Sequence, residues 1–116
     1  MDNLSIEEFK KLDIRVGTIV EAEVPKWSHY VMKLRIDLGP EIGERIIFAG
    51  IMNFFKPKDL IGKQSLYAIN LQPKKIGPEG DMSEGMMLMA VEKDDDTTPP
   101  VLLMPKKKVQ NGTRIM

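Results

Sequence analysis

Cysteine is absent from this sequence, and histidine occurs only once. Without thiols the chain can form no disulfide, thiolate zinc site or iron–sulfur cluster, and a single histidine cannot build a multi-histidine metal site. Phosphate-cradling glycine loops, nucleophile elbows and catalytic carboxylate pairs with a neighbouring base are missing as well. These absences predict a binding protein rather than an enzyme, with no cofactor and no metal.

Long apolar runs are missing too. The uncharged stretch 46–55 is as long as any in the chain, whereas a membrane-spanning helix needs about 20 apolar residues. The first residues, Met1–Leu4, have no basic region leading into an apolar stretch, unlike a secretory signal. We expect a cytoplasmic protein with no membrane partner. The length of 116 residues, with 42% of them hydrophobic, predicts one domain over residues 1–116.

Neither sign of charge is in excess, because 17 basic side chains balance 17 acidic ones. The distribution is uneven, however, with basic blocks at 54–78 and 99–116 and an acidic block at 79–98 between them. The fold either brings the two basic blocks onto one face, where they would attract an anionic partner, or leaves them as separate solvated loops. The basic side chains of the two blocks are Lys56, Lys58, Lys63, Lys74, Lys75, Lys106, Lys107, Lys108 and Arg114.

The first half of the chain combines one helix signal with three strand signals. Ser5 and Glu8 have the spacing of a capping box, which predicts a short helix from about residue 6 to 12. Alternating apolar residues then predict strands at 14–24 and 30–38. The run 45–51 is apolar on both faces, so we expect it to be the most buried strand.

Proline and glycine divide the second half. Pro57 and Gly62 have the positions that begin and end one or two helical turns, over residues 56–61. A fourth strand is predicted at 63–71 and a fifth at 85–91, with an exposed loop over 72–82 between them. The acidic run 94–96 lacks the spaced ligands of a calcium loop and predicts a solvated turn before a short apolar run.

These elements predict an all-β fold. Five strands with a short N-terminal helix and a small helix between strands three and four fit a five-stranded OB-fold Greek-key barrel, in which strand five pairs back towards strand one. Closure of the barrel removes the exposed edges that five strands would otherwise leave. An SH3-like barrel is the alternative, and the helix between strands three and four favours the OB fold.

Five short segments occur in the order seen in a known family. They are Leu12–Val20, Ile36–Gly39, Gly50-Ile51 with Phe55-Lys56-Pro57, Asn70–Ile76 and Ser83–Met86. Over about residues 5–115 the chain resembles the tRNA-binding OB domain family. That family includes the C-terminal domain or separate beta subunit of methionyl-tRNA synthetase, the free-standing structure-specific tRNA-binding protein and the chaperone CsaA.

The resemblance implies a homodimer that grips folded tRNA by its outside corner. The chain would then be a dimeric structure-specific tRNA-binding protein, either a methionyl-tRNA synthetase beta subunit or an accessory factor. The alternative is a CsaA-like protein-export chaperone that holds unfolded or pre-secretory polypeptides in an apolar groove. Apolar residues outside the predicted barrel strands would form the dimer seam, namely Phe9, Leu12, Val101, Leu102, Leu103 and Met104.

The family's tRNA-binding positions correspond to Asn70, Lys74, Lys75, Ser83 and Met86. The resemblance implies that the amide and hydroxyl bond sugar or phosphate, that the two lysines pair with phosphates and that Met86 contacts a base or ribose. The alternatives are that Asn70 caps a strand, Ser83 holds a turn and Met86 belongs to the barrel core.

Two loops depart from the family's pattern. An Asp-Lys pair is usual between strands one and two, whereas this loop carries Trp27 and Tyr30 on either side of Ser28-His29. The two aromatic residues form either a stacking platform for an unpaired base or a loop that packs on itself or on a second copy. The loop after strand four is longer and carries Glu79 and Asp81, which weaken its attraction for phosphate.

Overall fold

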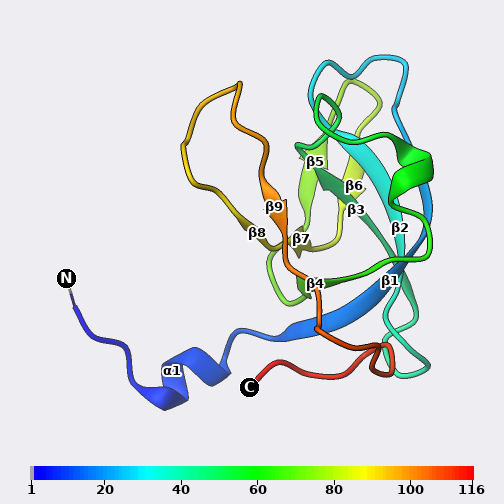
Figure 1. Cartoon of the computed structure of the whole chain (residues 1–116). Coiled ribbons are helices and arrows are strands. Elements are labelled where there is room, and N and C mark those ends of the chain that lie inside the picture. The colour runs from blue at the N-terminus through cyan, green and yellow to red at the C-terminus, as the bar shows by residue number, and fades with distance from the viewer. Residues whose placement is uncertain (1) are drawn as a thin grey trace.

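A short helix precedes a β-barrel in the computed structural model, which describes residues 2–116 (Figure 1). The helix α1 (Ile6–Lys10) begins with the predicted capping box, because Ser5 Oγ accepts a hydrogen bond from Glu8 N and the Glu8 carboxylate accepts one from Ser5 N. It buries no residue and lies outside the barrel. Over residues 2–116, no helix has the length and apolar character to cross a membrane.

The barrel is one antiparallel sheet of five strands. Its strands are β1 (Ile14–Glu23), β2 (Met32–Asp37), β3 (Glu44–Ala49), β4 (Gln64–Ala68) and β7 (Met86–Met87), in the order β3-β2-β1-β4-β7. The central strand β1 changes partner along its length, because residues 18–23 pair with β2 and residues 14–18 pair with β4. A Cβ atom on Gly17 would lie 2.6 Å from Ile36 Cγ2, so only glycine lets β1 coil this closely over β2.

The barrel closes between β3 and the residue that leads into β7. Glu84 N donates a hydrogen bond to Ile46 O at 2.8 Å, and Ile46 N donates to Glu84 Oε1 at 3.1 Å. The expectation that strand five pairs back towards strand one is wrong, since β7 pairs with β4. The C-terminal segment 112–115 instead covers the remaining edge of β1, where Val16 N donates to Thr113 O and Ile115 N donates to Ile14 O. The result is an OB-like fold.

The core lies inside this barrel, and β2 shows why the sequence predicts it. Met32, Leu34 and Ile36 are fully buried, while Lys33 and Arg35 between them face outward. Each buried aliphatic side chain contributes roughly 1.5–3 kcal/mol to folding. A slip of one residue would expose all three, so the alternation fixes the register of β2.

The most buried strand is β4 rather than the predicted third strand. Only Leu66 of β4 is partly exposed, whereas the first half of β3 is exposed or half-exposed. The reason is the number of strand partners: β3 is paired along its length with β2 alone, while β4 is paired with β1 and β7 and is covered by the C-terminal segment. Ser65 Oγ donates to Leu103 O, and Gln64 Nε2 donates to Val109 O.

Three further elements differ from expectation. Residues 56–61 form a single 3-10 turn, η1 (Pro57–Asp59), with hydrogen bonds from residue i to residue i−3. The segment between Pro57 and Gly62 is too short for further helical turns. The predicted loop 72–82 contains a hairpin of β5 (Lys74–Ile76) and β6 (Asp81–Ser83). The predicted fifth strand is divided between β7 and β8 (Met89–Ala90), which pairs with β9 (Val101–Leu102).

Candidate nucleic-acid interface

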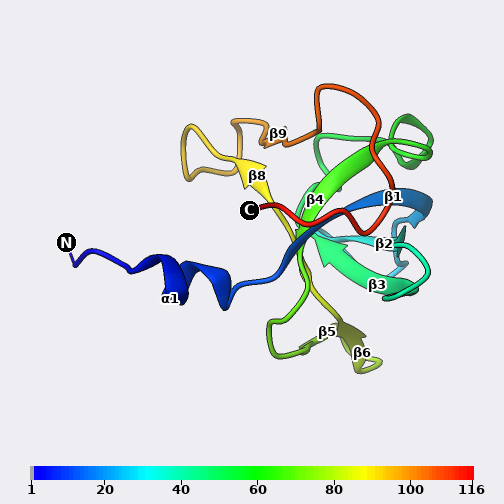
Figure 2. The ribbon, with the colours of Figure 1, turned by 90° about the horizontal axis from the view of Figure 1, so that it is seen from below.

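The β5–β6 hairpin projects from the barrel and carries both candidate lysines (Figure 2). Lys74 lies opposite Ser83 and Lys75 lies opposite Met82, and both lysines are exposed. Neighbouring residues of a strand point to opposite faces, so the two ammonium groups leave the hairpin on different sides. Within residues 2–116 neither lysine forms an ion pair. The hairpin therefore carries two exposed ammonium groups without ion-pair partners, although Glu79 and Asp81 make its net charge zero.

Ser83 fastens the base of this hairpin to the barrel. Its side chain is buried, and its Oγ accepts a hydrogen bond from Phe48 N at 3.0 Å and donates one to Gly85 O at 3.2 Å. The hydroxyl thus bonds the backbone on both sides. This geometry agrees with the alternative in which Ser83 holds the turn.

Asn70 and Met86 flank the hairpin in sequence, and the structure places them differently. Asn70 Oδ1 accepts a hydrogen bond from Asp13 N at 2.8 Å, and its Nδ2 donates to Lys11 O at 2.5 Å. The amide therefore ties the end of β4 to the link between α1 and β1. Met86 is 50% exposed on β7, so it is available for contact, whereas its neighbour Met87 belongs to the core.

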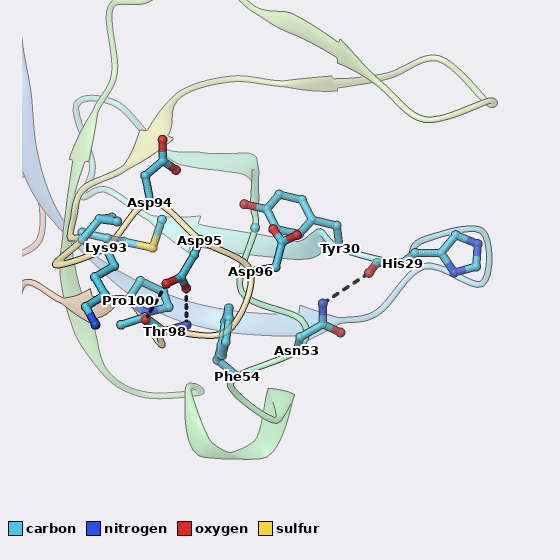
Figure 3. Close-up of a pocket in the computed structure, with 13 residues that line it drawn as sticks. His29, Tyr30, Asn53, Phe54, Lys93, Asp94, Asp95, Asp96, Thr98 and Pro100 are labelled. Carbon is cyan, nitrogen blue, oxygen red and sulfur yellow. Dashed lines mark hydrogen bonds between the residues drawn. The ribbon is translucent and has the colours of Figure 1, made fainter.

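Trp27 and Tyr30 do not form a common platform. The Trp27 ring packs against the Phe48 ring, with ring centroids 6.3 Å apart. It is the one such pair of aromatic rings within residues 2–116. Tyr30 is 58% exposed and borders a separate pocket with Phe54 and the acidic loop 92–98 (Figure 3). In that view the His29 side chain points away from the pocket. The two aromatic residues therefore belong to different surfaces.

The outer face of the barrel sheet is neutralised by its own ion pairs. Arg35 is paired with Glu21 and with Glu44, the latter at 3.5 Å, and Lys33 lies 3.9 Å from Glu23. Three carboxylates on this face thus surround two cations. Because a phosphate chain would have to displace these partners, the free lysines of the hairpin are the more favourable contact.

The fold divides the first basic block of the sequence between two places. Lys74 and Lys75 lie on the hairpin, whereas Lys63 precedes Gln64, whose side chain bonds the backbone of Val109 in the C-terminal block. In Figure 1 the hairpin stands at the upper end of the barrel, while the chain beyond β9 descends to the lower end. Figure 2 separates the same two segments. The hairpin lysines therefore lie apart from the C-terminal block, whereas Lys63 lies beside it. Charge counting along the sequence could not distinguish these arrangements, since the position of the C-terminal segment depends on its contacts with β1 and β4.

Comparison with known proteins connects this geometry to a family. Residues 14–114 match the family model described as "Putative tRNA binding domain". The chain belongs to the tRNA-binding domain family. Its match to the methionine–tRNA ligase of Parabacteroides distasonis is 39% identical over 98% of this chain. The chain spans 16% of the length of that ligase and 14% of the length of the ligase of Clostridium perfringens.

Solved structures confirm the likeness over the whole domain. The chaperone CsaA from Bacillus anthracis matches with a TM-score of 0.84 and 34% identity, covering 99% of this chain and 100% of the other. A protein described as related to methionyl-tRNA synthetase, from Pyrococcus horikoshii, matches with a TM-score of 0.85 and 31% identity, covering 100% of both chains. The family thus includes the two branches that the sequence resembles.

Proposed function

We propose that this chain is a non-catalytic, homodimeric factor that binds folded tRNA through its β5–β6 hairpin, as a beta subunit or accessory factor of methionyl-tRNA synthetase. The observation that carries the proposal is the pair of exposed, unpaired lysines, Lys74 and Lys75, on a hairpin fastened to the barrel. Membership of the tRNA-binding domain family supports the choice of ligand. The synthetase relatives support the choice of protein partner.

RNA chemistry explains why such a projection suits tRNA. Helical RNA hides its base edges in a deep, narrow groove, so a protein indifferent to sequence binds shape, phosphates and 2′-hydroxyls. Lysines on both faces of one hairpin can approach phosphates on either side of it. In this proposal Met86 adds an apolar contact, while Asn70 and Ser83 support the surface through the backbone bonds described above.

The proposal is tested by titrating labelled nucleic acids over a range of salt concentrations. Folded tRNA should bind better than single-stranded or duplex DNA, with no isoacceptor preferred tenfold. Changing Lys74 and Lys75 together to alanine should flatten the slope of log affinity against log salt by about 1.5 to 2, because two phosphate contacts are lost. Lys93→Ala, in the acidic loop, is the matched control and should change neither quantity.

A CsaA-like chaperone is the second candidate function. The likeness to CsaA, at 34% identity over 99% of this chain, supports it. Exposed apolar side chains such as Val101 and Met104, which are 56% and 52% exposed, would provide contacts for an unfolded or pre-secretory polypeptide. If the double lysine variant keeps its full affinity and salt slope while the protein binds denatured polypeptide, the chaperone function replaces the tRNA function.

A further inference from the structure

Trp27 connects two loops that the sequence keeps far apart. It lies between β1 and β2, yet its ring contacts the turn of the β5–β6 hairpin as well as Phe48 of β3. A Cβ atom added to Gly77 would lie 2.4 Å from Trp27 Cζ2 and 2.5 Å from Cη2. The indole therefore fills a space that exists only because residue 77 has no side chain.

The backbone beside Trp27 is held independently of the hairpin. Ser28 is buried, and its Oγ accepts hydrogen bonds from Tyr30 N at 3.2 Å and Val31 N at 2.9 Å while donating to Val31 O at 2.7 Å. Ser28 N also donates to Pro25 O. The loop thus presents the indole from a fixed position.

The hairpin needs such a support. Its sheet consists of β5 and β6 alone, and an isolated two-stranded hairpin is marginally stable in water. Ser83 fastens the base of the hairpin, and β6 also lies against β3. Within its turn, the bond from Gly80 N to Gly77 O is long, at 3.4 Å. Trp27 packs on the end of the hairpin that lies farthest from Ser83.

We infer that Trp27 is a positioning residue that clamps the tip of the β5–β6 hairpin against β3 and so fixes where Lys74 and Lys75 meet RNA phosphates. This inference rests on the proposed function. Trp27 then acts through the hairpin rather than by stacking on a base. An ordered hairpin loses less conformational freedom when RNA binds, so the clamp raises affinity without adding a charge.

Amide hydrogen exchange without RNA tests the clamp separately from the function. Trp27→Ala should reduce the protection of residues 74–83 by about tenfold or more, while β1 and β4 keep theirs. Trp27→Phe should restore part of it. Tyr30→Ala, which removes an aromatic side chain from the same loop, should leave protection of the hairpin unchanged. Unchanged protection in Trp27→Ala would overturn the inference and leave the proposed function standing.

Titration with tRNA then distinguishes positioning from direct contact. Trp27→Ala should weaken binding about tenfold while the salt slope stays constant, because both lysines remain. Loss of affinity with an intact hairpin would mean that Trp27 stacks on RNA. Unchanged affinity with a loosened hairpin would mean that the position of the hairpin does not matter for binding. Either result overturns the inference. If the double lysine variant binds tRNA normally, the proposed function fails, whatever the exchange data show.

A double-mutant cycle with Gly77 supplies a test that survives partial unfolding of the alanine variant. Gly77→Ala introduces a collision with the indole and strains a backbone whose φ is 77°. In a Trp27→Phe background the collision is smaller, so Gly77→Ala should cost less hairpin protection there than in the wild type. Equal costs in the two backgrounds would contradict the contact. Trp27 is the single tryptophan, so its fluorescence reports this contact without a label.

Discussion

Asp13 lies where the beginning of β1 meets the C-terminal segment. Its carboxylate accepts a hydrogen bond from Arg15 Nε at 2.6 Å and lies 3.8 Å from Arg114 Nε. The hydrogen bond from Arg15 is the main cause that lowers the pKa of Asp13, and the positive charges of both arginines lower it further against the opposing effect of partial burial. The ionised carboxylate is thus part of the folded structure.

Stability should therefore fall in acid. The pKa of Asp13 in the folded state lies below its unfolded value of about 3.9. The carboxylate therefore contributes fully to the free energy of unfolding at pH values above about 3.9, and this contribution is lost as the pH falls through the folded-state pKa. Asp13→Asn should cost about 1 kcal/mol at neutral pH and much less in acid, as measured by urea unfolding. Asp59→Asn is the control, since that exposed carboxylate has no ion pair within residues 2–116. A constant cost from pH 7 to pH 2 would contradict this role.

Two acidic side chains of the hairpin give a second prediction at this scale. Glu79 lies in the turn, and Asp81 lies opposite Ile76 beside the lysines. Changing them to glutamine and asparagine should strengthen tRNA binding about threefold at low salt, because like charges near the phosphates repel them. The gain should shrink as salt is added. Weaker binding, or a gain that does not depend on salt, would show that these carboxylates do not face the RNA.

At the scale of elements, the hairpin depends on Ser83. Replacing it with alanine leaves Phe48 N without its partner in a buried place, which should cost roughly 1–3 kcal/mol of unfolding free energy. Chemical denaturation measures this cost. If Ser83 instead contacts RNA directly, the alanine variant will keep its stability and lose affinity only.

Elements with purely local signals were predictable from the sequence. The capping box of α1 depends on Ser5 and Glu8 alone, and the alternation of β2 is visible in Met32 to Asp37. The hairpin was not predictable from the sequence. Prolines and glycines over residues 72–82 indicate a loop, whereas in the structure Gly77 and Gly80 belong to the turn between two strands. Nor could any pattern show that Asn70 and Ser83 bond remote backbone, since those partners depend on the tertiary fold. The exposure of Lys74 and Lys75 was predictable, because it follows from the local composition of a segment rich in proline and glycine.

At the scale of the whole molecule, α1 and the β8–β9 pair project from the same side of the barrel in Figures 1 and 2. Apolar side chains on both are exposed, among them Leu4 and Ile6 near the helix and Val101 on β9. Together they offer a surface that a second copy could cover, as the proposed homodimer requires. A self-complementary seam of this kind needs about 800 Å² from each partner.

Sedimentation equilibrium at micromolar concentration should give about twice the chain mass of 13.2 kDa. Changing Ile6 and Val101 together to serine should shift the protein towards the monomer with little change in the barrel, because both side chains are exposed. A control exchange of Ile61, which is 51% exposed on the η1 side, should leave the mass unchanged. A monomer mass for the wild-type chain would contradict the dimer.

The closure of β1 by the C-terminal segment also bears on how the chain reaches this structure. Arg15 Nη1 donates to Gly112 O across a sequence separation of 97 residues. Loop-closure entropy must be overcome before such remote pairings contribute, so proteins dominated by them refold in milliseconds to seconds rather than microseconds. Until residues 112–115 arrive, one edge of β1 has unpaired backbone groups that a strand of another chain could bind. Docking of residues 112–115 therefore also protects the protein from aggregation through this edge.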